Sequence, residues 1–181
     1  MRSRSTKWAA LAKSGQFGMD TIAIIGTKTY TAISAPSIEY AVFGDKPSVG
    51  NCAVGSMRVS VLTSDAISAG QSVVIKARLT GDSAEESTEF LEFGTFYIDT
   101  REANNGLLTL SCYDAMLKAS QQYADPTKPD DRIGWPKTMA ACVSEIAARI
   151  GVSIDERTAI KTTAPYQIPY PNKLTMMQVL G

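Results

Sequence analysis

Acidic side chains are the residues of this chain whose type and spacing could support catalysis. Glycoside hydrolysis needs two carboxyl groups about 5–10 Å apart across a cleft. Acids gather at Asp130 and Asp131, at Asp99 and Glu102, and in a loop that holds Glu85, Glu86, Glu89 and Glu92. Neighbouring acids in a polar loop are typical of a solvated surface, and an exposed ion pair with Arg101 explains Asp99. The sequence therefore predicts no catalytic residue.

Other catalytic and ligand-binding chemistries lack the residues that they need. The chain has no histidine, which excludes histidine-dependent nucleophilic catalysis and the commonest zinc ligand. It has no G-x-G-x-x-G or G-x-x-x-x-G-K-[S/T] phosphate-binding loop. The three cysteines, Cys52, Cys112 and Cys142, are too far apart in sequence to suggest a thiolate metal site. We therefore expect no enzyme activity, no cofactor and no metal.

Aromatic side chains near prolines suggest a different chemistry, the stacking of rings on a sugar. Trp135, Tyr166 and Tyr170 lie in the proline-rich second half of the chain. A carbohydrate-binding module would need these three rings on one exposed platform. The simpler interpretation is that the rings pack on neighbouring prolines, since aromatic side chains commonly serve as core. The binding module is kept as an alternative function.

Composition narrows the class of partner. The 181 residues are 44% hydrophobic and 20% charged, as in an ordinary globular protein, and 18 basic residues balance 18 acidic ones. Proteins that bind nucleic acid usually have a basic excess. No apolar run approaches the ~18 residues of a membrane span. We therefore expect neither a nucleic-acid partner nor a membrane span.

The strongest structural signal lies between Phe93 and Leu117. Asn105-Gly106 supplies the positive φ angles of a tight hairpin turn, and Asp114 follows where a helix N-cap is expected. The runs on either side of the turn place apolar side chains on every second residue, at Phe96, Ile98, Leu108, Leu110 and Cys112. A hairpin that leads directly into a helix indicates a junction between a β-rich part and a mixed part.

Similar alternation fills the chain upstream of this hairpin. Ile22 and Ile24 alternate with Thr21 and Ala23, and Gly26-Thr27-Lys28 forms a turn. Further alternating runs are Ile38–Val42, Met57–Val61 and Val73–Leu79. Six or seven short strands separated by turn signals are typical of a small barrel or a sandwich.

Helix signals lie at the two ends of the chain. Ser5 and Gly15 bracket a predicted helix over Thr6–Lys13, which docks either on its own domain or on a neighbouring subunit. Pro136 begins a predicted helix that runs to Ile150, with Gly151 as its stop and a short strand at Val152–Ile154. Its apolar stripe is Met139, Val143, Ile146 and Ile150.

A capping box at Thr175–Gln178, with Leu174 and Val179 as its hydrophobic staple, starts a last helix. Only about one turn follows before Gly181, so we expect the chain to end inside a larger architecture.

These patterns predict an α+β fold. A β-rich barrel or curved antiparallel sheet is followed by a small helix-containing α/β domain. The predicted divisions are an N-terminal helix or arm at 1–19, a β-barrel-like domain at 20–113, and a small α+β domain at 114–181.

Several segments, in this order, also resemble a known family. They are KPSVGNCAVGSMRVSVL (46–62), EFGTFYIDTRE (92–102), LTLSCYDAMLKA (108–119), WPKTMAACVSEIAARIGVSID (135–155) and YQIPYPNKLTMMQVLG (166–181). The order resembles the N-terminal part of tail-associated, baseplate-hub-like proteins of phages and prophages of Gram-positive bacteria. The first 45 residues carry little of the resemblance.

The resemblance implies a structural component of the tail tip or baseplate hub, present in the virion and assembled in the host cytoplasm. Such proteins form a homotrimeric ring that joins the tail tube, or a distal tail protein, to host-recognition or cell-wall-degrading parts. It carries over no catalytic residue. Predicted subunit contacts are Trp8 and Leu11 in the N-terminal helix, and Lys46 and Pro47 in a Gly/Pro-rich loop. A fragment of a peptidoglycan hydrolase is the remaining alternative.

Overall fold

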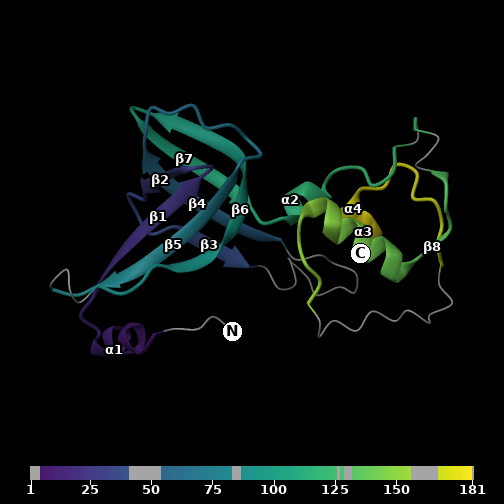
Figure 1. Ribbon diagram of the computed structural model, residues 1–181. Coiled ribbons are helices and arrows are strands. Elements are labelled where there is room, and N and C mark those ends of the chain that lie inside the picture. The colour runs from purple at the N-terminus through teal and green to yellow at the C-terminus, as the bar shows by residue number, and fades with distance from the viewer. Residues whose placement is uncertain are drawn as a thin grey trace. The chain divides into compact units, whose positions relative to one another are not determined.

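A computed structural model describes residues 5–40, 54–82, 87–125, 127–128, 132–155 and 167–180. The chain divides into two compact units (Figure 1). We call them the β unit, within Met1–Glu39 and Gly55–Asp114, and the helical unit, within Tyr40–Val54 and Ala115–Gly181. A large antiparallel sheet with few helices confirms the predicted α+β class.

The β unit is built on a seven-stranded sheet with the order β2-β1-β5-β6-β7-β4-β3. Its ladders are antiparallel between β1 and β2, β1 and β5, β5 and β6, β6 and β7, and β4 and β7. The strands are β1 (Gly18–Ile25), β2 (Lys28–Thr31), β3 (Ser37–Tyr40), β4 (Gly55–Leu62), β5 (Ser72–Thr80), β6 (Leu91–Asn104) and β7 (Leu107–Tyr113).

Alternation along the strands selects the core of this unit. The predicted inward residues of β4, β5, β6 and β7 are all buried, and most of them form one cluster, which includes Val59, Ile75, Phe96 and Leu110. In β1 the buried residues are instead Thr21, Ala23 and Ile25, while Ile22 and Ile24 are only half-buried. Because β1 is apolar on both faces, its alternation does not fix which face points inward. The antiparallel pairing of β1 with β5 fixes which face of β1 points inward.

The sheet curls back on itself, but it is not a closed barrel. Ala32, next to the end of β2, forms an isolated bridge with Val61 of β4, and the Ile33 N–H donates to the Ser60 carbonyl at 2.9 Å. A ladder of hydrogen bonds closes a true barrel, whereas a single bridge joins these two strands. Of the two predicted forms, the curved antiparallel sheet is therefore the correct one (Figure 1).

Asp65 adds side-chain hydrogen bonds at this junction between the β2 end of the sheet and β4, which we call the seam. Its Oδ2 accepts a hydrogen bond from the Tyr30 hydroxyl at 2.7 Å and another from Lys28 Nζ at 3.0 Å. These bonds lower the pKa of Asp65, which indicates that the folded β unit favours the ionised carboxylate. They hold β2 to the loop that follows β4, where the ladder is missing.

We expect Asp65→Ala to lower the denaturation midpoint of the β unit in urea, since it removes both bonds across the seam. The control is Glu102→Ala, which breaks the exposed ion pair between Arg58 of β4 and Glu102 of β6, the two strands that flank β7. Exposed pairs of that kind contribute about 0–1 kcal/mol. Equal shifts in the two variants would show that Asp65 has no special role in closing the sheet.

The hairpin of β6 and β7 is confirmed, but Asp114 does not cap a helix. Asn105 and Gly106 have φ angles of 48° and 80°, as the predicted turn requires. The Asp114 carboxylate instead accepts a hydrogen bond from the Gly55 N–H at 2.7 Å. The short helix α2 (Met116–Ala119) has Ala115 at its N-cap and no side-chain cap. Because β7 pairs with β4, the start of β4 lies beside Asp114 and uses its oxygen.

The helical unit packs α2, α3 (Met139–Ile150) and α4 (Met176–Leu180) around a second core. Strand β8 (Lys137–Thr138) pairs with β9 (Gln167–Ile168). The buried members of this core are Ala119, Tyr123, Cys142, Ile146, Ile150 and Met176. Cys112 and Cys142 are buried free cysteines, and Cys52 lies outside the described residues.

Two boundaries in the helical unit differ from the prediction. Helix α3 starts after Thr138, whose hydroxyl accepts from the Ala141 N–H, so Pro136 lies outside the helix. The two residues between Pro136 and the start of α3 are extended and form strand β8, which pairs with β9. Val152–Ile154 is not a strand, and both of these apolar side chains are exposed. Gly151 ends α3 in the left-handed region at φ 76°, as predicted.

The last helix begins as the sequence indicated. The Gln178 N–H donates to the Thr175 hydroxyl at 3.2 Å, and the Thr175 N–H donates to Gln178 Oε1 at 2.9 Å. This reciprocal pair is a capping box.

Candidate interaction surfaces

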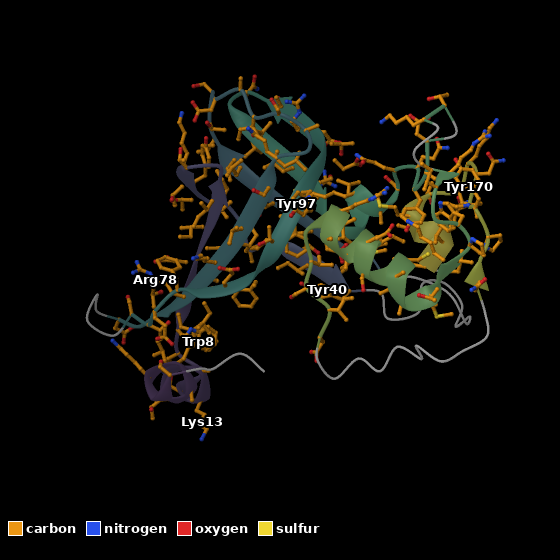
Figure 2. All side chains as sticks on the ribbon, turned by 45° about the vertical axis from the view of Figure 1, so that its right-hand side comes forward. Trp8, Lys13, Tyr40, Arg78, Tyr97 and Tyr170 are labelled. Atoms are coloured by element: carbon orange, nitrogen blue, oxygen red, sulfur yellow. The ribbon has the colours of Figure 1, made fainter. Side chains whose placement is uncertain are left out.

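The N-terminal helix α1 (Thr6–Ser14) is the first surface that the sequence singled out. Ser5 caps it by accepting from the Trp8 N–H at 3.1 Å, and Gly15 ends it at φ 71°. None of its residues is buried, and Trp8 and Leu11 are half-buried. Figure 2 shows Trp8 pointing from α1 toward the sheet, and Lys13 pointing away from it. The predicted contacts Trp8 and Leu11 thus lie on a helix that covers its own unit only lightly.

A carboxylate from the β unit completes the cap of α1. The Ser5 hydroxyl donates to Glu89 Oε2 at 2.8 Å, and the Ser5 N–H donates to Oε1 at 3.3 Å. Hydrogen bonds from the backbone of Glu89 and from Ser5, together with the charge of Lys7, lower the pKa of Glu89. A negative charge at a helix N-terminus is also favourable because of the helix dipole. Sequence reasoning missed this contact because the two residues are 84 positions apart.

The other two predicted contacts, Lys46 and Pro47, lie outside the described residues. They stay predictions.

Three aromatic residues of the helical unit, Tyr123, Trp135 and Tyr170, pack on one another. Trp135 meets Tyr123 edge-on, with ring centroids 5.7 Å apart, and Tyr170 edge-on at 5.8 Å. Both Trp135 and Tyr170 are half-buried, and Trp135 packs against the second core. Lys137 Nζ lies 4.9 Å from the centre of the Trp135 ring. Contacts within the protein thus cover part of both rings, and Tyr166 lies outside the described residues.

Glu145 of α3 joins three segments of the helical unit. It accepts a hydrogen bond from the Tyr123 hydroxyl at 2.7 Å, and Lys137 Nζ of β8 lies 2.8 Å from each of its oxygens. The Arg149 guanidinium lies 4.9 Å from the centre of the Tyr123 ring. Partial burial raises the pKa of Glu145, but the bonds from Lys137 and Tyr123 and the charges of Lys137 and Arg149 outweigh it. The net effect lowers the pKa.

This network predicts that acid weakens the helical unit. The pKa of Glu145 lies below its ordinary value of 4.5 only in the folded state, so near that pH the unfolded chain binds the proton more readily. The stabilisation is present above pH 4.5 and is lost as the pH falls through the folded pKa. We expect Glu145→Gln to flatten the acid side of the stability curve followed by Trp135 fluorescence in a Trp8→Phe background. Glu102→Gln, at the exposed pair with Arg58, is the control and should leave the curve unchanged.

Two further acidic residues that the sequence singled out form ion pairs on the sheet. Glu92 pairs with Lys76 at 3.6 Å and Glu102 with Arg58 at 3.3 Å. A shallow hollow over β3, β4 and β7 contains one acid among its lining residues, Glu39, and so does not supply a carboxylate pair. Within the described ranges, no group of three acids, cysteines or histidines could hold a metal ion. Nor does that part of the chain contain a helix long and apolar enough to cross a membrane.

Comparison with known proteins finds similarity at the level of the fold. No protein-family model matches the sequence, and no curated protein matches it. The fold is similar to that of a prophage tail protein. The crystal structure of the prophage MuSo2 43 kDa tail protein from Shewanella oneidensis aligns with a TM-score of 0.51 and 13% sequence identity. The alignment covers 90% of this chain and 48% of that chain, so this chain spans about half the length of the neighbour.

Proposed function

We propose that this chain is a structural component of a phage or prophage tail, located at the tail tip or baseplate hub. There it links the tail tube to distal parts that recognise the host or degrade its cell wall. Its partners are copies of itself, arranged as a homotrimer, and other tail proteins such as the distal tail or tube protein. It assembles in the host cytoplasm, stays in the virion tail, and catalyses no reaction.

The observation that carries this proposal is the similarity in fold to a prophage tail protein over 90% of the chain. The sequence segments that resemble hub-like proteins give separate support. They correspond to elements that build both cores: GTFYID lies in β6, CYDAML joins β7 to α2, and the last segment starts α4. The short motifs and the overall path of the chain both favour a phage tail protein, and the position at the hub is favoured by the motifs alone.

The two alternative functions have less support. A carbohydrate-binding module needs exposed ring faces, whereas Trp135 packs against Tyr123, Tyr170 and Lys137. A peptidoglycan hydrolase needs two carboxylates in one cleft. Glu92 is paired with Lys76 on the neighbouring strand β5, and Glu102 is paired with Arg58 of β4 across β7. Incubation with purified peptidoglycan is expected to release no soluble fragments.

Light scattering at several protein concentrations tests the structural role. We expect a discrete oligomer whose mass corresponds to three chains, and ring-shaped particles in negative-stain images. A mass of one chain at every concentration would contradict the ring and favour a module that acts alone.

A further inference from the structure

Helix α1 has an incomplete cap of its own. In a capping box the third helical residue is Glu or Gln, and its side chain bonds back to the N-cap N–H. In α1 that position is Trp8, which cannot accept this bond, whereas in α4 Gln178 provides it within the same segment. Glu89 supplies the missing acceptor to Ser5 from a distant part of the sequence. The carboxylate that completes the cap of α1 can therefore come from Glu89 of the same chain or from Glu89 of a second copy.

Charge makes this docking selective. The first 19 residues contain four basic residues and no acidic one, whereas residues 82–92 contain five acidic residues and no basic one. The whole stretch from Asp20 to Asp114 has 12 acidic and 6 basic residues. Oppositely charged surfaces attract each other and repel wrong partners. The contact of Glu89 with Ser5 at the N-terminus of α1 follows this difference in charge, whichever copy of the chain provides each residue.

The hinge between α1 and the sheet is short and leaves apolar surface uncovered. Three residues, Gly15, Gln16 and Phe17, join α1 to β1, with Gly15 in the left-handed region. Short hinges favour exchange of an element between copies. Phe17 and Met19 beside the hinge are 46% and 48% exposed. A second copy lying against the hinge would cover them, together with the half-buried Trp8 and Leu11.

We propose that α1 is an exchangeable arm, whose N-terminus docks on Glu89 of a second copy of this chain. In the exchanged form, α1 of one copy makes the same contacts with the second copy that it makes here with its own β unit. Exchange of identical elements is a low-cost route to association between copies. This inference rests on the contacts of α1 alone and holds whether or not the chain is a tail component.

Carbodiimide cross-linking tests it on the full chain. The reagent joins an amine to a nearby carboxylate, and Lys7 follows two residues after Ser5, whose hydroxyl lies 2.8 Å from a Glu89 oxygen. Chains labelled with ¹⁴N and ¹⁵N are mixed in denaturant, refolded together and cross-linked over a range of concentrations. Peptide mass spectrometry then shows whether Lys7 and Glu89 in each product come from one chain or from two.

We expect mixed-isotope Lys7–Glu89 products, in a share that rises with protein concentration, and covalent dimers from protein that was never unfolded. The internal control is the Lys137–Glu145 pair, 2.8 Å apart in the helical unit, whose products should carry a single isotope. Glu89→Gln should abolish the first product and leave the control product unchanged. Single-isotope Lys7–Glu89 products at every concentration, or none at all, would overturn the exchange. If light scattering still showed an oligomer, the proposed tail role would survive that result.

Discussion

Replacing Phe96 by alanine is expected to lower the free energy of unfolding of the β unit by about 3–5 kcal/mol. Phe96 lies on β6 opposite Val73 of β5, and its side chain is 1% exposed within the first core. Truncation removes the burial of the ring and leaves a cavity. Strand β6 is paired with β5 on one side and β7 on the other, so the backbone around Phe96 cannot move easily to fill the cavity. Urea denaturation followed by far-ultraviolet circular dichroism measures the loss.

The neighbouring residue provides a matched control for this variant. Thr95 is exposed on the same strand, so Thr95→Ala changes strand propensity by about 1 kcal/mol or less without opening a cavity. A loss below about 1 kcal/mol for Phe96→Ala would mean that the ring is not packed in the core. Similar losses in the two variants would contradict the assignment of the inward face of β6.

Local signals predicted the parts of this fold that local chemistry decides. Ser5 and Gly15 delimit α1 as expected, and Thr175 and Gln178 cap each other. Asn105 and Gly106 adopt positive φ angles in the hairpin turn. Each of these features depends on residues within a few positions of each other, so the sequence contains all the information that the feature requires.

The errors arose where a distant segment competes for a local group. Asp114 has the side chain of an N-cap, but pairing of β7 with β4 brings the Gly55 N–H to its carboxylate. Pro136 suits a first helical turn, but pairing of β8 with β9 keeps the next residues extended. A single sequence does not reveal which strands pair, so neither competition could be foreseen.

The contact surface of α1 was only partly predictable, because its helical face is a local feature whereas its partner is distant in sequence. Helical spacing identified Trp8 and Leu11 as one face of α1, and both are half-buried. The acceptor that anchors this helix, Glu89, was taken for a solvated loop acid, because nothing near it in sequence suggests Ser5 as its partner. The seam residue Asp65 was missed likewise, since Tyr30 and Lys28 reach it only after the sheet curls.

The second large effect is expected in the helical unit. Ile146 is fully buried among Tyr123, Cys142 and Met176, so Ile146→Ala should lower the free energy of unfolding of that unit by about 2–5 kcal/mol. Ser144 is exposed on the same helix, and Ser144→Ala should change the value by no more than about 0.5 kcal/mol. The comparison separates the cavity in the core from any change in helix propensity.

The two tryptophans make it possible to observe where the loss of stability falls. Trp135 packs against the core that contains Ile146, whereas Trp8 belongs to the β unit. In a Trp8→Phe background, fluorescence therefore reports only on the helical unit, and circular dichroism of the strands follows the β unit. Because each unit buries its own cluster of apolar residues, Ile146→Ala should move the fluorescence transition to lower urea and leave the strand transition in place. Equal shifts of both transitions would show that the cores unfold cooperatively, and Phe96→Ala would then lower the Trp135 transition as well.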